Sequence, residues 1–520
     1  MFDSKLAIRI EKNVYFKANL TKRFAFFCTL FVVRFVLSVG ILCGKKVKSC
    51  CMNYLEKLQK LYQSQDDYLQ RDIFCGVNLH VVSLDTMSDS KKVCDFVLQP
   101  LAFLKNAETL DNVFSTLLLG ANAKKEPNFD ALVQDFFNGY TLVFAENEEG
   151  CVAVDTRTSL SRAIVEPPTS MVMRGPREGF IEDVKANVTL LRKRLKSPDF
   201  KTINLNVGNY TNTAVCVCYI QGVADQKLVD MAVQKLQSIS IDGILDSSYL
   251  ARYLDSDKTF LFRRIGTTEK PDVAVGKMLE GRLAVVVDGS PMVLTLPYLF
   301  IEDLQSLGDY YENTFVVGLR RVLRLLSVLA SVLLPSLYVC LQMYNYQIIP
   351  LKFLITILNA TQSIPFTPLT EMLIVIILFD ILREANLRMP SAVGITLSLV
   401  GAIILGDAAV NAGLMGAPAV MIGALSGIGL FAMPDNTLVL SLLRIAITFL
   451  SGLMGMMGVM LSLLVLMLYL ASLENYKTPF LAPYAPNIPN DRQDAMSQKP
   501  LQKQKLRPKS IPHENNTRRG

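Results

Sequence analysis

Acidic side chains in the most apolar part of the chain are the residues best placed to do chemistry. Between Leu325 and Leu470 only nine residues carry a charge. Asp407 lies near the end of one apolar stretch without a basic neighbour in sequence, and Glu371 opens another. An ionisable group inside a bilayer is costly, so its presence indicates a functional position. We take Asp407 and Glu371 as candidate ion-path residues. The alternatives are an interhelical hydrogen-bond anchor at Asp407 and a charge favoured by the helix dipole at Glu371.

A second charged group lies toward the other end of the segment that Glu371 opens. It comprises Asp380, Arg383 and Glu384. Residues three apart, such as Asp380 and Arg383, share one face of a helix. The simplest interpretation is an ion pair at a helix end, in the headgroup region of a membrane.

The polar part of the chain offers no catalytic or metal-binding cluster. Asp288-Gly-Ser-Pro291 follows an apolar strand pattern, but no histidine base is near in sequence, and Gly-Ser-Pro is ordinary turn chemistry. Two histidines and ten cysteines without a CxxC pair do not indicate a zinc site, and there is no glycine-rich phosphate loop. Cys216 and Cys218 share one face of a predicted strand. We expect reduced cysteines, no metal, no cofactor and no enzymatic activity.

Composition indicates a polar domain followed by a membrane domain. The 520 residues are 51% hydrophobic and 19% charged, with a mean hydropathy of +0.32. The membrane block begins at Arg320, Arg321 and Arg324 and ends near Leu470. The net charge of +7 gathers near the chain ends, beside apolar segments, where it orients helices and does not indicate nucleic acid. The predicted fold class is an α/β N-terminal soluble domain of two subdomains followed by an all-α polytopic membrane domain.

The expected domain boundaries follow these changes in composition. They are an N-terminal extension (1–51), a first soluble subdomain (52–165), a second, α/β subdomain (166–316), a membrane domain of four to six helices (317–472) and a basic, mostly disordered tail (473–520). Within the soluble part, periodicity predicts helices at 184–195 and 228–236, strands at 203–207, 215–219 and 283–288, a loop at 124–128 and a break at 166–168.

The first fifty residues have three open interpretations. Phe24–Gly44 is apolar behind basic residues, like a signal peptide, but Arg34 lies in its middle and no small-x-small cleavage site follows. The segment is a weak anchor, an uncleaved interfacial helix, or an extension upstream of a native start at Met52.

The number of membrane crossings is left open by the sequence. The arginines at 320–324 and the lysines of the tail both favour the inner side, so the number of crossings should be even. The stretch at 351–363 is short for a span and is re-entrant or interfacial, whereas 438–470 is too long for one. Either the short stretch crosses, or the long one breaks at Gly452, Gly455 or Gly458 and folds back.

A dozen short motifs appear in order along the chain. The longest is Val172–Phe200, which reads VMRGPREGFIEDVKANVTLLRKRLKSPDF. It strongly resembles the signature of the GerA-type spore germination proteins, A subunit. The motif and coupling residues taken from this resemblance are Arg174, Gly175, Pro176, Arg177, Glu178, Gly179, Asp288, Gly289, Pro291, Arg320, Arg321, Arg383 and Glu384.

The resemblance implies a non-enzymatic receptor subunit in the inner membrane of bacterial endospores. Its implied partners are a transporter-like B subunit, a lipoprotein C subunit, the lipid bilayer and further copies of itself, and it implies no nucleic acid. The A subunit would be the oligomeric, ion-releasing part, with the N-terminal domain and the tail on the core side. The alternative is a membrane-anchored adaptor for a separate channel, such as the SpoVA-type complex, whose linked relative shares the pattern.

Two positions depart from the family pattern. Ile376 stands where the pattern has a second acidic residue after Glu371, which weakens a carboxylate-lined path through that helix. Lys270 stands where the pattern has arginine, a change that matters only where the arginine makes two parallel hydrogen bonds.

Overall fold

The computed structural model describes residues 54–62, 65–104, 110–146, 150–158, 175–255, 261–390, 394, 400–401, 403–500, 502 and 504–518. The N-terminal extension, the predicted break at 166–168 and Arg174 lie outside these residues. The chain divides into two compact units: residues up to 64 with 68–84 and 90–156, and residues 65–67, 85–89 and 157 onward.

The first unit is built on an antiparallel sheet in the order β1-β2-β4-β5-β3. Its elements are α2 (Tyr54–Tyr62), β1 (Tyr68–Phe74), β2 (Asn78–Leu84), α3 (Ser90–Val93), α4 (Gln99–Phe103), α5 (Leu110–Leu118), β3 (Ala123–Glu126), α6 (Phe129–Phe137), β4 (Thr141–Ala145) and β5 (Cys151–Val154). The predicted loop at 124–128 was wrong, since β3 occupies most of it. Charged Lys124 and Lys125 hide this strand from a hydrophobicity pattern, because it lies at the sheet edge, where lysines discourage pairing with other chains.

The second unit contains an antiparallel sheet in the order β6-β7-β9-β10-β8. Its strands are β6 (Phe200–Val207), β7 (Thr213–Ile220), β8 (Gly266–Thr268), β9 (Leu283–Val287) and β10 (Val293–Leu296), and its helices are α7 (Val184–Arg194), α8 (Gln226–Gln237), α9 (Ser247–Leu254) and α10 (Pro271–Leu279). The predicted helices and strands of this unit are confirmed.

Successive side chains of β7 point to opposite faces of this sheet, and both faces are buried. Val215 and Val217 pack with α8 and α9, whereas Cys216 and Cys218 pack with α7 and α10. The two thiols lie on one face, as expected, with Sγ atoms 3.7 Å apart. The six cysteines among the described residues are all free thiols.

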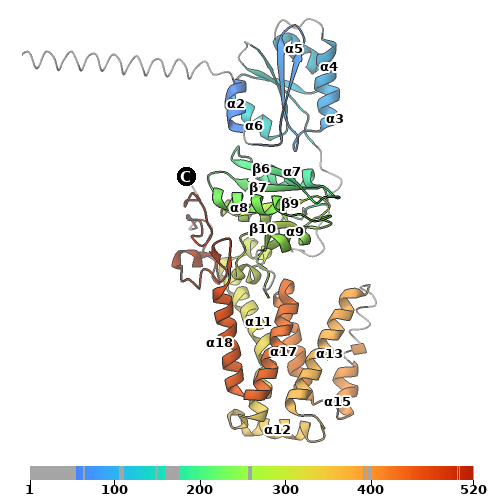
Figure 1. Ribbon diagram of the computed structural model, residues 1–520, viewed down its shortest axis with the longest axis vertical. Helices are drawn as coiled ribbons and strands as arrows, with labels where there is room; N and C mark the ends of the chain where they lie inside the picture. The colour runs from blue at the N-terminus through green and yellow to red at the C-terminus, as the bar shows by residue number, and fades with distance from the viewer. Residues whose placement is uncertain are drawn as a thin grey trace, which may run out of the picture. The chain divides into compact units, whose positions relative to one another are not determined.

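Apolar helices follow the second sheet (Figure 1). They are α11 (Thr314–Met343), α12 (Leu351–Thr361), α13 (Pro368–Arg388), a π-helical turn η5 (Ile404–Ala408) continued by α15 (Ala409–Asn411), α16 (Ala417–Gly429), α17 (Thr437–Met454) and α18 (Met456–Ser472). Two segments, Thr314–Met343 and Pro434–Met454, are long and apolar enough to cross a membrane. The 11 residues of α12 extend only about 17 Å, too little for a hydrocarbon core of about 30 Å.

The long last apolar stretch breaks at one of the three glycines that were predicted to break it. Gly455 has φ +61°, a left-handed conformation that ends α17 and starts α18. Tyr344 packs against this glycine, and its hydroxyl donates a hydrogen bond to the carbonyl of Gly452 at 2.8 Å. The two helices lie side by side (Figure 1).

The C-terminal tail differs from the disordered segment that we expected. It contains β11 (Glu474–Asn475), β12 (Thr478–Pro479) and the 3₁₀ turn η8 (Pro489–Gln493). Phe480, Ala495 and Ile511 are almost completely buried. The basic composition of the tail suggested disorder. These few buried apolar side chains, however, supply enough buried surface to order it.

Candidate functional site

The first membrane helix begins with three arginines in different surroundings. Asn313 caps α11, and its side chain accepts a hydrogen bond from the backbone N–H of Phe315. Arg320 is partly exposed and pairs with Glu312 at 2.8 Å. Arg321 has no exposed side-chain surface, and Arg324 is about three-quarters buried. Arg321 and Arg324 therefore belong to the interior of the protein, whereas Arg320 faces outward.

Asp309 is the acidic centre of this region. It lies in the 3₁₀ turn η3 (Leu307–Tyr311) and is completely buried. Arg324 donates two hydrogen bonds to its carboxylate, at 2.7 and 2.8 Å, and Arg321 a third at 3.3 Å. Burial alone would raise the pKa of Asp309, but the hydrogen bonds from Arg324 and the nearby positive charges lower it. Asp309 is thus held as a carboxylate.

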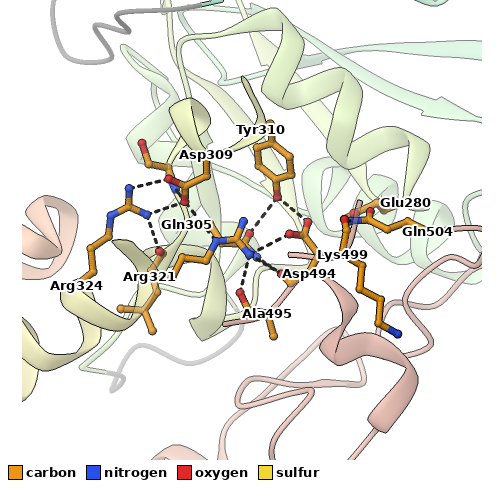
Figure 2. A network of polar contacts seen from close by, with 12 residues as sticks. Glu280, Gln305, Asp309, Tyr310, Arg321, Arg324, Asp494, Ala495, Lys499 and Gln504 are labelled. Atoms are coloured by element: carbon orange, nitrogen blue, oxygen red, sulfur yellow. Dashed lines mark hydrogen bonds and ion pairs between the residues drawn. The ribbon is translucent and has the colours of Figure 1, made fainter. Parts of the chain in front are cut away.

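The C-terminal tail completes the site. Arg321 Nη1 donates to Asp494 Oδ1 at 2.9 Å and to the carbonyl of Ala495 at 2.6 Å. Tyr310 donates its hydroxyl proton to Asp494 Oδ2 at 2.8 Å. Figure 2 shows Asp309, Tyr310, Arg321, Arg324 and Asp494 converging from three segments of the chain. We call these five residues the junction.

The junction joins the end of the soluble part, the start of α11 and the tail by balanced buried charges. Two arginines face two aspartates, and removing one member of such a group leaves an uncompensated buried charge. A shift of η3 or of the tail must therefore either carry α11 with it or break these ion pairs. This arrangement fixes the three segments relative to one another.

A second charged network lies beside the junction and lines a cavity of about 770 Å³. Glu302 accepts hydrogen bonds from Arg282 and from the backbone N–H of Leu299, and it forms an ion pair with Lys277 at 2.8 Å. Burial raises the pKa of Glu280 and lowers the pKa of Lys277. Within the described residues no group of three or more His, Cys, Asp or Glu side chains is arranged to hold a metal ion.

The described part of the RGPREG motif, from Gly175 to Gly179, packs next to the junction. Gly175 has φ +127°, and a Cβ atom there would lie 2.7 Å from the ring of Tyr311, the residue after Tyr310. Lys270 Nζ donates a single hydrogen bond to the carbonyl of Pro176 at 3.2 Å, so here the lysine replaces arginine without a second bond. Glu178 pairs with Arg194 of α7 at 2.8 Å. Arg177 and Gly179 belong to the same segment. The motif is a structural support for η3.

Asp288, Gly289 and Pro291 form a turn, as predicted for Asp288–Pro291. Asp288 Oδ1 accepts a hydrogen bond from the backbone N–H of Val184 at 3.3 Å, and the N–H of Gly289 donates to the carbonyl of Glu182 at 2.7 Å. The intervening Ser290 is buried, and its hydroxyl donates to Asp246, the N-cap of α9. These contacts position elements around the sheet.

Glu371 and Asp407 occupy different environments. Glu371 lies in the first turn of α13 and is 2% exposed, and its Oε1 accepts a hydrogen bond from the N–H of Gly416 at 2.6 Å. Asp407 is exposed on η5, where its Oδ1 accepts a hydrogen bond from Asn411 at 2.6 Å. Ile376 is fully buried in an apolar cluster with Met372. No direct contact joins the two acids among the contacts described.

Asp380 is partly buried, with a side chain that is 20% exposed, and has two basic partners. It pairs with Arg383 at 3.4 Å, as the spacing predicted, but also with Arg444 of α17 at 2.7 Å. Glu384 pairs instead with Arg388. Arg444 has no exposed surface, and an arginine within an apolar stretch requires a carboxylate partner. The position of Arg444 within an apolar stretch could therefore have indicated, from the sequence alone, that it pairs with an acidic residue. No comparable feature of the sequence marks Asp494 as a site residue.

Comparison with known proteins gives the chain its family. The pattern described as Bacillus/Clostridium GerA spore germination protein matches residues 56–510. Spore germination protein KA of Bacillus subtilis (strain 168) is 32% identical over 475 residues, which cover 90% of this chain and 87% of the relative. Spore germination protein GerQA of Bacillus cereus is 28% identical over 473 residues, 89% and 93% of the two chains.

Among solved structures, an N-terminal domain of a related receptor subunit is similar to part of this chain. It is the N-terminal domain of the A subunit of the Bacillus megaterium spore germinant receptor GerK3, with 26% identity and a TM-score of 0.37, covering 47% of this chain and 94% of that one. The uncharacterized membrane protein YfkQ of Bacillus subtilis (strain 168) is 31% identical over 83% of this chain and 85% of its own length. The family comprises receptor subunits and not enzymes. The chain therefore belongs to the GerA family of spore germination proteins, as the A subunit of a germinant receptor.

Proposed function

We propose that this A subunit forms the oligomeric, cation-releasing part of a nutrient receptor in the inner membrane of the spore. Its partners are a transporter-like B subunit, which binds the nutrient, and a lipoprotein C subunit. The α/β part and the tail lie on the core side, since basic residues at the start of α11 and in the tail favour that side. The turn at Gly455 supports this orientation because it folds α18 back beside α17, which supports an even number of crossings.

The junction is the observation that carries this proposal. A soluble domain that merely sat beside a membrane anchor would not need two arginines of the first membrane helix buried against its own aspartate. Because Asp309 and Asp494 hold Arg321 from two separate segments, a signal that moves the soluble domain reaches α11 directly. Lone acids such as Glu371 and Asp407 then give the membrane part its preference for cations.

Potassium release from purified spores tests the proposal. We compare spores of the source strain with and without the gene, after nutrient addition, and complement the deletion with wild type, Asp309→Asn, Asp407→Asn or Glu312→Gln. Loss of release in the deletion and in Asp309→Asn, with normal release in Glu312→Gln, is the expected result. Slower release or altered ion selectivity in Asp407→Asn would place that acid near the path.

Other outcomes separate the proposal from its alternative. If spores without the gene release potassium normally, the protein is an accessory subunit or an adaptor for a separate channel. If Asp407→Asn behaves as wild type while the deletion releases nothing, the receptor role stands and Asp407 is not on the path.

A further inference from the structure

The cavity beside the junction is large enough to hold a small molecule. Its volume of about 770 Å³ lies within the range of about 300–1,000 Å³ that is usual for ligand sites. Its lining comes from α10, from the start of α11, from the tail, and from Phe431 and Pro434 between α16 and α17. Soluble part, membrane helices and tail therefore all border this space.

Three arginines of the lining converge on the C-terminal end of α10. Arg507 Nε donates to the carbonyl of Leu279 at 2.8 Å, and Arg518 Nη2 donates to Glu280 Oε1 at 2.8 Å. Arg282 Nη2 lies 3.3 Å from the other carboxylate oxygen of Glu280. Two guanidinium groups thus share one carboxylate, and the third binds the residue before it.

Arg507 is a buried cation without a carboxylate partner. The residue is 8% exposed and forms no ion pair among the described residues. Its Nη1 donates instead to the carbonyls of Asn515 and Thr517. Burial and the nearby charge of Arg518 lower the pKa of Arg507, because both disfavour the charged guanidinium. An anion beside these two arginines would relieve that cost.

Positive charge exceeds negative charge at this end of the cavity. Four basic side chains face two carboxylates: Arg282, Lys277, Arg507 and Arg518 against Glu280 and Glu302. The C-terminal end of a helix adds only about half a negative charge. The other carboxylates of the lining are bound by other groups: Asp303 and Asp435 by Arg263, Asp494 by Arg321, Asp272 by Tyr311, and Asp491 by the backbone N–H groups of Lys509 and Ser510.

Several buried polar atoms of the lining have no hydrogen-bond partner among the described residues. Three are donors, the Nε atoms of Arg263, Arg282 and Arg518. Two are acceptors, Asp272 Oδ1 and Asp303 Oδ2. Buried polar groups are nearly always paired with protein, water or a ligand. A ligand that satisfies these atoms carries an anionic, acceptor-rich group together with hydroxyl groups.

We propose that this cavity binds a phosphate group, held by Arg282, Arg507 and Arg518. A phosphate dianion supplies the charge that this end of the cavity lacks, and guanidinium groups bind phosphate oxygens through two parallel hydrogen bonds. The remaining volume takes a hydroxyl-bearing group such as glycerol. The phosphate belongs to a soluble ester or to the headgroup of a membrane lipid, since α11 and the connection between α16 and α17 border the cavity.

The phosphate site adjoins the junction. Arg518 binds Glu280 and Gln504, and both lie beside Asp494 in Figure 2. Because Arg507 and Arg518 belong to the tail and Arg282 follows α10, a phosphate between them holds the tail against α10. The ligand therefore fastens the same tail whose Asp494 binds Arg321 of α11. This role is independent of whether the membrane part conducts ions.

Equilibrium dialysis of radiolabelled glycerol phosphate against the detergent-solubilised full-length chain tests the proposal. We expect saturable binding, which Arg507→Gln and Arg518→Gln each weaken at least about tenfold because charge-assisted hydrogen bonds are lost. Arg507→Lys keeps the charge but loses the paired hydrogen bonds, and should weaken binding severalfold. Arg492→Gln is the matched control, because it removes the same charge from an exposed arginine of the tail outside the lining. Circular dichroism checks the folding of each variant.

Hydrogen exchange of the wild-type chain is a readout that needs no variant. The backbone N–H groups of Arg507 and Arg518 donate to the carbonyls of Asn516 and Lys505, and their exchange should slow at saturating glycerol phosphate. Unchanged exchange at saturation would place the bound ligand elsewhere and overturn the proposal. The absence of saturable binding, or equal weakening by Arg492→Gln and Arg507→Gln, would overturn it as well.

Competition identifies the source of the phosphate. Micelles that contain phosphatidic acid, at concentrations far below those needed of unlabelled glycerol phosphate, displace the label if the ligand is a lipid headgroup. Equal displacement by the two compounds supports a soluble ester. Micelles of phosphatidylcholine, whose phosphate is a diester beside a fixed positive charge, should displace the label in neither case, and displacement by them would contradict recognition of a phosphate dianion.

Discussion

Arg321 shows how strongly one residue ties the two halves of the second unit together. Its guanidinium, without any exposed surface, binds a carboxylate of η3 and both a carboxylate and carbonyl groups of the tail. Burying a charged pair gives little net stability, but breaking one is strongly destabilising. We therefore infer that the ion pairs of the junction hold the three segments in a single arrangement.

Asp309→Asn tests this reading at the level of stability. The variant leaves Arg321 and Arg324 buried with one carboxylate fewer, and we expect a loss of about 3 kcal/mol in the free energy of unfolding. Denaturation of the detergent-solubilised chain, followed by circular dichroism, measures it. The control is Glu312→Gln, whose partner Arg320 is partly exposed, and which should cost less than about 1 kcal/mol. Equal losses in both variants would show that burial of the junction is irrelevant.

The stability of the folded protein should depend on pH through the protonation of Asp303. Burial raises its pKa to about 6, although Arg263 and the hydroxyl of Tyr298 act in the opposite direction. Its ordinary pKa is 3.8, so the folded state binds the proton more tightly than the unfolded state does. The stability that this proton contributes is complete below about pH 4 and is lost as the pH rises through about 6.

Thermal unfolding between pH 4 and pH 7 checks this dependence. We expect the decline in Tm attributable to Asp303 to disappear in Asp303→Asn. Asp130→Asn, at an exposed helix start, should keep the wild-type profile. A wild-type profile in Asp303→Asn would contradict the assignment.

Sequence reasoning identified contacts between residues that lie close together along the chain and missed contacts between residues that lie far apart. The pairing of Asp380 with Arg383 and the turn at Asp288 depend on local spacing, and both are present. Asp494 lies 173 residues from its partner Arg321, and Asp380 lies 64 residues from its partner Arg444; no local pattern encodes such contacts. The sequence therefore predicted that the arginines mark a boundary, but not which of them are buried.

At the scale of elements, Gly455 decides the course of the last two helices. An alanine there meets the ring of Tyr344 at about 3.0 Å and must adopt a left-handed conformation. We expect Gly455→Ala to lower stability by about 1–2 kcal/mol, measured by thermal denaturation in detergent. Gly427→Ala in α16 is the matched control, because no heavy atom lies within 4 Å of the added methyl group and alanine favours a helix. If Gly455→Ala unfolds at the same temperature as wild type, the account of this turn is contradicted.

The tail is held to the protein by a small aromatic cluster. Phe480 is fully buried, and its ring lies 5.9 Å from that of Phe300 and 6.4 Å from that of Phe262. Phe480→Ala should cost about 3–5 kcal/mol and release the tail. Limited trypsin digestion would then cut the basic segment around Lys503 to Lys509 faster than in wild type. Tyr484→Ala, at a side chain that is partly exposed, should digest at the wild-type rate; digestion of Phe480→Ala at that same rate would mean that the tail is held elsewhere.

Elements were predictable where their pattern was strong and apolar. The strands β6, β7 and β9 and the helices α7 and α8 follow clear periodicity, and all were predicted. The edge strand β3 and the tail were missed, because β3 is mostly charged and the tail is polar and basic, while a few contacts order both.

At the scale of the whole molecule, the chain combines the buried ion pairs of the junction with a membrane part that contains buried charge. Membership of the GerA family establishes the receptor role, and the structure adds where movement of the soluble part meets α11. We propose that these features serve cation release by an oligomer that assembles with partner subunits.

Potassium efflux from liposomes containing only the wild-type chain tests the central claim most directly. The account predicts efflux above that of protein-free liposomes and selectivity for monovalent cations over chloride. Efflux equal to that of protein-free liposomes, from protein shown to be inserted and folded by circular dichroism, would contradict the claim and assign conduction to another protein.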